Sequence, residues 1–283
     1  MSIAVTILTY NRLDFLKEIV YSIKNQTLKP DEIIVVNNSS TDGTTEWLEE
    51  QEELTVITQP NVGSSGGQWR ALKEAHNKGH EWIWTMDDDV VPEQNCLELL
   101  MNDRIEKKIR APLRFLNTGK PFFNDVLTVN LTNPFKSIWS TVYSEDNLNE
   151  EYTDAVGITF EGPVIHRSVI EKIGLPEKDF FIYGDDTEYF VRAWKADFDI
   201  VVYRDAVLNR KLHYQSIPDE FNWKTYYMIR NIIAIDRLHG NHAVRWLRPF
   251  GYFIKWLGRI HRFKDIFTVI KASIAGWFYK SNW

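Results

Sequence analysis

The stretch "IAVTILTYNRLDFLKEIVYSIKNQ", residues 3–26, joins a short β-rich run to a helical pattern. Residues 3–8 are apolar and rich in β-branched side chains, and the polar turn "TYNR" follows them. After the turn, apolar side chains recur at helical spacing: Leu13, Leu16, Ile19, Val20 and Ile23. This unit predicts a strand followed by a helix.

The same order repeats along the first 90 residues. "DEIIVVNNSSTDGT" is a buried-type strand that ends in turn formers, and the helical run "TTEWLEEQ" follows. "LTVITQP" leads to the glycine-rich loop "NVGSSGG" and the helical run "QWRALKEAHNKG", and "EWIWTM" stops at three aspartates. This alternation predicts βαβ units and a mostly parallel sheet. Its polar motifs then fall at the carboxyl ends of strands, where such sheets bind ligands.

Composition indicates a globular protein of 283 residues, 44% hydrophobic and 25% charged. The length allows one large α/β domain with an appendage, or two modest domains. The single cysteine, Cys96, excludes an internal disulfide and a cysteine-based metal cluster. There is no basic leader before an apolar run and no apolar stretch of about 18 residues, so we expect a cytoplasmic protein.

The charge is distributed unevenly. Residues 239–283 hold eight Lys or Arg against one acid, Asp265, which gives this tail +7 and the remainder −13. Aromatic and aliphatic residues alternate with the cations at roughly helical spacing, a pattern typical of amphipathic helices that lie on an anionic membrane. The alternatives are the dimer interface of a homo-oligomer, or a helix packed on the rest of the chain. The acidic remainder and the lack of a recognition motif argue against nucleic acid as a partner.

The run "WTMDDDVVP", residues 84–92, places three carboxylates at the end of a strand. Strand side chains alternate with period two, so Asp87 and Asp89 are expected on the same side and Asp88 on the other. Such hard oxygen ligands suit Mg²⁺ or Mn²⁺ bridging a diphosphate. The alternative is an acidic turn in which Asp88 or Asp89 caps a helix near Pro92.

A second acidic pair, Asp185 and Asp186, follows an apolar run in "FFIYGDDTEYFVRA". One of these carboxylates can serve as a general base for an attacking hydroxyl. The structural alternative is a helix cap, because Asp185 and Glu188 have capping-box spacing. His213, in "KLHYQS", is either a structural histidine or the imidazole that completes a metal site with two carboxylates.

Two more motifs end predicted strands. "VVNNSSTDGT" offers donors and acceptors suited to a base and a ribose, or forms an Asx-turn before a helix. "NVGSSGG", residues 61–67, permits close backbone approach. It is neither a P-loop nor a G-x-G-x-x-G motif, so ATPase and dinucleotide-binding functions are unsupported.

In this order the motifs resemble the family 2 inverting glycosyltransferases of GT-A fold, and most closely the galactofuranosyltransferase-like and rhamnosyltransferase-like branch. The resemblance covers about residues 1–231. It implies a Rossmann-like α/β domain over residues 1–222, with a mostly parallel central sheet flanked by helices. Residues 1–110 would form the nucleotide-sugar half and residues 111–222 the acceptor half. Residues 223–283 would form a helical extension.

The resemblance also implies roles for particular residues. Donor binding is expected of Thr9, Asn11, Arg12, Asn38, Gly63, Asp87 and Asp88. Asn38 stands where many members carry Asp, which leaves the identity of the nucleotide's base open. A Mn²⁺ or Mg²⁺ ion is expected on Asp87, Asp89 and His213. Asp186 matches the catalytic base with Asp185 beside it, and the sequence leaves open which of the two is the base. Acceptor binding is expected of Asp185, Trp223, Tyr226 and Arg230.

The function implied is transfer of a hexosyl unit, with galactofuranose from UDP-galactofuranose favoured, to a hydroxyl of a lipid-linked glycan in cell-surface polysaccharide synthesis. The enzyme would then lie at the inner face of the cell membrane. The alternatives are transfer of rhamnose from dTDP-rhamnose and a non-catalytic sugar-nucleotide-binding or scaffold role. A scaffold is expected to lose the acids, which are present. A sugar nucleotidyltransferase would carry a glycine-rich basic loop where "TYNRLDF" stands.

Overall fold

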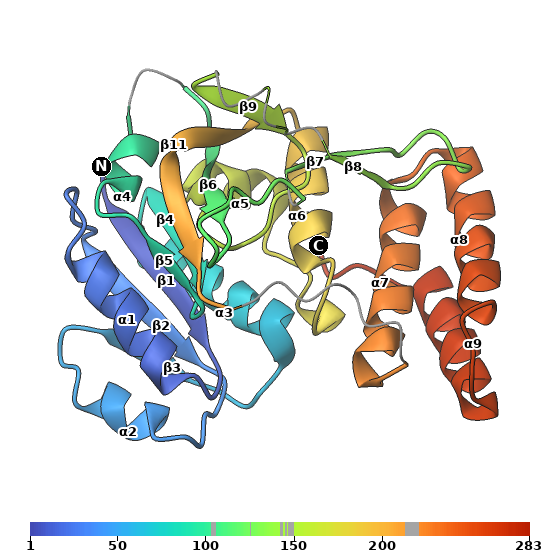
Figure 1. The fold of residues 1–283 in the computed structure, drawn as a ribbon, viewed down its shortest axis with the longest axis horizontal. Coiled ribbons are helices and arrows are strands. Elements are labelled where there is room, and N and C mark those ends of the chain that lie inside the picture. Colours follow the sequence, from blue (N-terminus) through green and yellow to red (C-terminus); the bar gives the residue numbers. More distant parts are fainter. Residues whose placement is uncertain (103–105, 125, 142–143, 145, 147–149, 213–220) are drawn as a thin grey trace.

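The computed structural model describes residues 1–102, 106–124, 126–141, 144, 146, 150–212 and 221–283. Figure 1 shows a central sheet with helices on both sides and a further group of helices at the carboxyl-terminal end of the chain. No helix among the described residues is long and apolar enough to cross a membrane.

The amino-terminal part alternates strands and helices, as the sequence predicts. Its elements are β1 (Ile3–Thr9), α1 (Leu13–Lys24), β2 (Glu32–Asn37), α2 (Thr44–Glu49), β3 (Thr55–Thr58), α3 (Gly63–Asn77) and β4 (Trp82–Asp87). The four strands are parallel in the order β3-β2-β1-β4. Their carboxyl ends therefore meet at one edge of the sheet.

The glycine-rich segment is the start of a helix, not the loop expected from the sequence. α3 begins at Gly63, and its glycines allow close packing. A Cβ on Gly67 would lie 2.2 Å from Leu8 Cδ1 on β1, and one on Gly63 would lie 2.0 Å from the carbonyl oxygen of Phe181. The clash at Gly63 is with the backbone, so this position requires glycine for space, whereas a Cβ on Gly67 would force the Leu8 side chain to shift.

The second part of the chain extends the same sheet. It contributes β5 (Val90–Pro92), α4 (Cys96–Leu100), β6 (Ile109–Phe115), β9 (Tyr152–Ala155), β10 (Val164–His166), α5 (Arg167–Ile173), a 3₁₀ turn (Lys178–Phe180), α6 (Asp185–Lys195) and β11 (Ile200–Arg210). The sheet continues from β4 as β10-β6-β11-β5, and β9 pairs with β11. β10 is antiparallel to both β4 and β6, whereas β6 and β11 are parallel. The expected mostly parallel GT-A sheet is confirmed, with β5, β9 and β10 reversed.

Helices cover both faces of the sheet because strand side chains alternate between them. Ile3, Val5 and Ile7 of β1 pack against α1 and α4 on one face. Ala4 belongs to the opposite cluster, which includes side chains of α3, α5 and α6. This is the double layer that βαβ connections produce.

The carboxyl-terminal extension consists of α7 (Trp223–His239), α8 (His242–Leu257) and α9 (Phe263–Trp277). α7 contacts α6, α8 and α9. The separate hairpin of β7 (Leu127–Val129) and β8 (Trp139–Thr141) leads toward the same helices (Figure 1).

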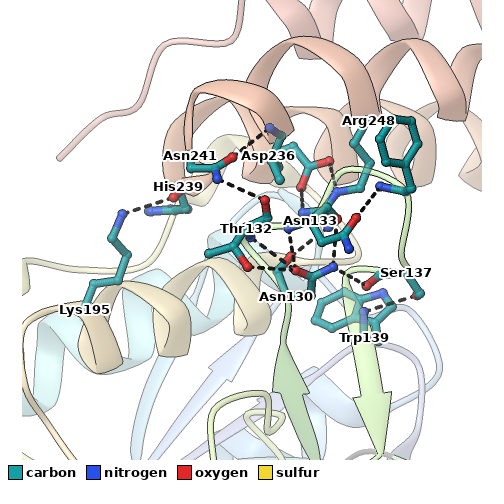
Figure 2. A network of polar contacts seen from close by, with 12 residues as sticks. Asn130, Thr132, Asn133, Ser137, Trp139, Lys195, Asp236, His239, Asn241 and Arg248 are labelled. Carbon is teal, nitrogen blue, oxygen red and sulfur yellow. Dashed lines mark hydrogen bonds and ion pairs between the residues drawn. The ribbon is translucent and has the colours of Figure 1, made fainter.

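Polar contacts fix the extension to this hairpin (Figure 2). Arg248 of α8 donates to both carboxylate oxygens of Asp236 on α7, at 2.7 and 2.5 Å, and to the carbonyl of Asn130 at 2.7 Å. Asn241, the N-cap of α8, donates to the carbonyl of Thr132 at 2.9 Å. Arg248 is therefore a structural ion-pair residue and not part of the exposed basic surface expected of the tail.

Candidate active site

An open cleft of about 810 Å³ lies at the carboxyl ends of β1 and β4 and at the amino termini of α3 and α6. It collects most of the site residues expected from the sequence. Those in its lining are Thr9, Arg12, Asn38, Gly63, Asp87, Asp88, Asp89, Asp185, Asp186 and Trp223. Motifs that lie up to about 200 positions apart in the sequence thus share one surface.

The three consecutive aspartates all line this cleft. β4 ends at Asp87 and a turn occupies residues 88 and 89, so the alternation expected of a strand does not apply to Asp88 and Asp89. Arg12 Nη1 lies 2.8 Å from Asp88 Oδ1 and 2.9 Å from Asp89 Oδ2. Asp88 Oδ2 also accepts from Thr9 Oγ1 at 2.8 Å. Both oxygens of Asp88 are therefore engaged by the end of β1 and its turn.

Asp87 is held differently. Its Oδ1 accepts a hydrogen bond from Gln68 Nε2 of α3 at 2.9 Å. Burial raises the pKa of Asp87 well above its ordinary value, and the nearby charges of Glu161, Asp89 and Asp88 add to the rise. Like charges crowded in a buried place are compensated when a cation binds among them.

The residues present fit a divalent cation. Asp89 Oδ1 is buried and has no hydrogen-bond partner among the described residues, so one carboxylate oxygen is left for a ligand. Carboxylate oxygens are the donors that Mg²⁺ and Mn²⁺ favour. The expected third ligand, His213, lies outside the described residues. Within the described residues no three His, Cys, Asp or Glu side chains form a ready metal site.

A buried charge cluster beside the aspartates was not identified from the sequence. Glu161 forms ion pairs with Arg114 of β6 and, at 3.7 Å, with Arg210 of β11. Burial opposes ionisation of Glu161, but Arg114 and Arg210 outweigh it and hold its pKa below the ordinary value. All three residues line the cleft. The available signal was the placement of single charged residues inside apolar runs, as in "APLRF".

The second acidic pair occupies the first turn of α6. Burial raises the pKa of Asp185 to about 7, and the adjacent Asp186 adds to the rise. Burial also raises the pKa of Asp186, against the hydrogen bonds that Thr187 donates to its Oδ1 from N at 2.6 Å and from Oγ1 at 3.2 Å. A carboxyl group that titrates near neutral pH can exchange protons with a substrate.

Neither acidic run caps a helix through its side chain. The N-cap of α6 is Gly184, which has no side chain to do so, and α4 begins after Asn95. Glu188, the partner expected in a capping box, instead pairs with Arg192 at 2.9 Å and with His239 at 3.0 Å. The expected side-chain caps are therefore not formed at the N-cap positions, although Asp186 accepts from the first-turn amide of Thr187 at the amino terminus of α6.

Two residues expected at the donor site, Asn38 and Asn11, form hydrogen bonds to the loops that border the cleft. Asn38 Nδ2 donates to the carbonyl of Gly63 at 3.0 Å, while its Oδ1 accepts from Gln59 at 2.8 Å. Asn11 adopts a left-handed backbone, with φ of 54°, and its Oδ1 accepts from the amide of Thr41 at 2.7 Å. Asn11 does not line the cleft, so it acts on the site by joining the ends of β1 and β2.

The expected acceptor residues separate into two groups. Trp223 lines the cleft with 60% of its surface exposed, whereas Tyr226 and Arg230 are not part of the lining. The Arg230 guanidinium instead donates to the carbonyls of Asp179 and Phe180, at 2.7 and 2.9 Å.

The expected Trp223 belongs to a group of aromatic and basic side chains at the cleft whose other lining members, Phe181 and Lys224, were missed by sequence reasoning. Phe181 stacks on Tyr227 with ring centroids 4.9 Å apart and meets Trp223 edge to face at 6.1 Å. Lys224 lies 5.7 Å from the Trp223 ring centroid. Phe181, Trp223 and Lys224 all line the cleft beside Asp185. Exposed aromatic faces with a cation beside them suit a polar ring such as a sugar.

The sequence profile of the Glycosyl transferase family 2 matches residues 4–174, which is more than half of the chain. The chain therefore belongs to the family 2 glycosyltransferases and is a glycosyltransferase. Within that family it is galactofuranosyltransferase-like.

Two curated relatives carry the finer likeness. Galactofuranosyltransferase GlfT1 of Mycobacterium tuberculosis (strain CDC 1551 / Oshkosh) is 24% identical over 278 residues, which cover 89% of this chain and 88% of that protein. Galactofuranosyltransferase GlfT2 of Mycolicibacterium smegmatis is 27% identical over 217 residues, which cover 69% of this chain and 33% of that protein. The chain thus matches about a third of the length of GlfT2.

Solved structures share the fold at low sequence identity. The crystal structure of GalNAc-T7 with UDP, GalNAc and Mn²⁺ has a TM-score of 0.69 and 12% identity, over 96% of this chain and 54% of that one. The crystal structure of S. aureus TarS 1–349 has a TM-score of 0.60 and 16% identity, over 98% of this chain and 81% of that one. These likenesses show the GT-A fold.

Proposed function

We propose that this glycosyltransferase moves galactofuranose from UDP-galactofuranose to a hydroxyl group of a lipid-linked glycan, with inversion at the anomeric carbon. The observation that carries the proposal is the pairing of two sets of acids in one cleft. Asp87, Asp88 and Asp89 lie on the side of the amino-terminal strands, and Asp185 and Asp186 lie on α6. The identity to two galactofuranosyltransferases favours this sugar over rhamnose.

The donor side would hold the nucleoside diphosphate. Thr9, Arg12, Asn38 and Gly63 line the cleft next to the aspartates and offer donors and close backbone approach. Asp87 and Asp89 would hold Mn²⁺ or Mg²⁺. The bound ion would supply charge neutralisation for the diphosphate leaving group. Arg12 keeps Asp88 and Asp89 in place through its two short contacts.

The acceptor side would carry the proton transfer. Asp186 takes the proton of an acceptor hydroxyl, and the oxygen forms a bond to the anomeric carbon from the face opposite the diphosphate. The bond between that carbon and the diphosphate oxygen breaks, and UDP leaves with the electron pair. Asp185 shares the proton equilibrium of Asp186, because the two carboxyls interact. The acceptor sugar would rest on Phe181 and Trp223.

The test is nucleoside diphosphate release by the purified protein with Mn²⁺ or Mg²⁺ and a lipid-like glycan acceptor. The donors are UDP-galactofuranose, UDP-galactopyranose, UDP-glucose and dTDP-rhamnose, and Asp89→Ala is the control variant. Release from UDP-galactofuranose that is lost in Asp89→Ala supports the proposal. Release from dTDP-rhamnose alone establishes the rhamnosyltransferase alternative. If no donor is turned over or raises the Tm, the non-catalytic binding or scaffold role is favoured.

We also infer a peripheral position on an anionic membrane, because the surface of the extension fits one. Five apolar side chains of α9 and its end fall at spacings of four, three, four and four and are 39–77% exposed: Phe263, Phe267, Ile270, Ile274 and Phe278. α8 adds Trp246, Phe250 and Ile254, also exposed. Residues 239–283 are all described, and their single acid, Asp265, is buried while Lys264 and Lys271 are exposed. An apolar stripe edged by cations matches anionic lipid.

Vesicle co-sedimentation tests this position. Full-length protein should bind vesicles that contain about a third anionic lipid and bind neutral vesicles far less, since each basic residue near the surface adds about 1 kcal/mol. The double variant Phe267→Ser with Ile274→Ser should lose binding, and Glu46→Ser on α2 should not. A concentration-dependent dimer without vesicle binding would show that this face pairs with a second copy of the chain.

A further inference from the structure

The segment that precedes the catalytic carboxyls has an unusual backbone. We call residues 177–184 the dyad loop, because Asp185 and Asp186 follow it directly. Phe181 and Tyr183 have φ of 65° and 67°, in the left-handed region that non-glycine residues rarely adopt. Such conformations persist only where the surroundings impose them, and they concentrate at functional sites.

Asn231 of α7 imposes this backbone from behind. Its Nδ2 lies 3.0 Å from the carbonyl oxygen of Phe180, 2.9 Å from that of Ile182 and 2.7 Å from that of Tyr183, so its two N–H groups are shared among three acceptors. Its Oδ1 accepts from Arg230 Nε at 2.8 Å. The amide is buried, with 1% of Asn231 exposed, so water does not compete for these carbonyls. One side chain thus binds three carbonyl groups of a loop that is not part of a β-sheet.

The front of the loop is fixed by α3. The amide of Ser65 donates to the carbonyl of Phe181 at 3.2 Å, and Ser64 Oγ lies 3.4 Å from the same oxygen. Gly63 permits this approach because it has no Cβ. The loop is therefore held between the donor half of the cleft and the helical extension.

The segment after α9 binds the amino-terminal end of the dyad loop. Glu177 is fully buried and accepts from Tyr279 Oη at 2.8 Å and from the amide of Asn282 at 2.8 Å. Asn282 Nδ2 also donates to Asp179 Oδ2 at 2.6 Å. The contacts of the extension with the dyad loop therefore come from both α7 and the segment after α9.

We propose that Asn231 is a positioning residue for the Asp185–Asp186 pair, acting through the carbonyls of the dyad loop, and that α7 and the segment after α9 support the active site from the side of this loop that faces the extension. The kinetic test of this inference rests on the proposed role of Asp186 as the base. The hydrogen-exchange test does not. The loop lines the cleft with Phe181, Ile182 and Tyr183, so its conformation also sets the acceptor surface.

The kinetic test compares Asn231→Ala with Ile233→Ala. Ile233 is equally buried on the same helix but packs within the extension and has no hydrogen bond to the loop, which makes it a matched control for lost stability. A shift of the carboxyls by about 1 Å is expected to lower kcat about 100-fold in Asn231→Ala. The Kd for UDP should stay within about threefold. Equal kcat losses in the two variants, relative to folded fraction, would overturn the proposal.

A second readout does not depend on activity. Amide hydrogen exchange over residues 178–187 should speed up at least about tenfold in Asn231→Ala, while β1 and β4 keep their protection. Tyr279→Phe, which removes one hydroxyl donor, should speed up exchange only near Glu177. If the wild-type protein shows no transfer, the proposed function fails and hydrogen exchange still decides the proposal. Unchanged exchange of the dyad loop in folded Asn231→Ala would overturn it.

Discussion

The two sets of acids in the cleft differ in what surrounds them. Asp88 and Asp89 touch a guanidinium, that of Arg12, at 2.8 and 2.9 Å. In the described part of the chain, Asp185 and Asp186 have no ion pair, and burial raises the pKa of Asp185 to about 7. Arg12 partly offsets the burial that raises the pKa of Asp88 and Asp89, whereas no arginine pairs with the second set in the described residues, and Asp185 can take up a proton near neutral pH.

The difference shows that neighbouring residues can suit aspartate either to bind a cation or to act as a general base. Crowded carboxylates that leave an oxygen without a partner among the described residues, as at Asp89 Oδ1, are suited to hold a cation, whose charge would compensate theirs. Carboxyls that exchange protons near pH 7 are suited to act as a base. The following predictions test this division, with the largest expected effect first.

Asp186→Asn tests whether the second set performs chemistry. We expect kcat for glycosyl transfer to fall about 10³-fold, because general-base catalysis contributes about 10²–10⁴. The Kd for UDP, measured by calorimetry, should not change. Asp205→Asn serves as control, since Asp205 is exposed and pairs only with Arg204 among the described residues. A variant with near-native kcat would remove Asp186 as the base.

Chelation and Arg12→Met test whether the first set performs binding. EDTA should abolish transfer, and added Mn²⁺ or Mg²⁺ should restore it. In Arg12→Met the Kd for UDP should rise about tenfold with a smaller change in kcat, because the variant loses the cation that holds Asp88 and Asp89. Arg167→Met, which breaks a surface pair with Glu171, is the matched control. A large loss of kcat with unchanged UDP affinity would contradict the assignment of the first set of acids to donor binding.

The pH dependence of transfer should follow the Asp185–Asp186 pair. The base Asp186 must be ionised and burial raises its pKa, so kcat should fall with decreasing pH in a range where a carboxyl with an ordinary pKa would still be ionised, approaching tenfold per pH unit. The Kd for UDP should change less between about pH 6 and 8. A rate that stays flat down to about pH 5.5 would contradict the assignment, because a carboxyl with an ordinary pKa would remain ionised there.

The smallest expected effect is on stability. The folded-state pKa of Asp185, about 7, lies above its unfolded value near 3.8, so the folded protein binds the proton more tightly. This contribution is complete below about pH 4 and is lost as the pH rises through about 7. Asp185→Asn removes the charge and should raise the free energy of unfolding at about pH 8 by about 1–3 kcal/mol, with little change at about pH 4. Urea denaturation at both pH values measures it, and equal gains at both would contradict the cause.

The amino-terminal fold was predictable because its signals are local. The alternation in residues 3–87 reports strands and helices directly, and each strand ends in a polar motif. The reversed direction of β5, β9 and β10 was not predictable, because these strands are only three or four residues long. Their pairing depends on partners far along the chain, as in the pairing of Val164 with both Trp84 and Arg110.

The site was predictable where acids or glycines form runs, and was missed where single charges meet through the fold. Arg114 and Arg210 sit on adjacent strands, and Glu161 precedes β10. None of the three stands in a motif. Asp88 was expected to point away from its neighbours, but a turn that begins after Asp87 brings it to Arg12.

The sequence by itself determined the order of strands and helices, the family, and the acids at the end of β4 and in the first turn of α6, because these are carried by contiguous residues. Only the tertiary structure decided which charges compensate which acids. It also decided that Arg230 and Asn231 serve the dyad loop from behind. The physical reason is that pKa values and loop conformations depend on burial and on contacts within a few ångströms, and these are fixed by residues that the fold brings together from distant parts of the chain.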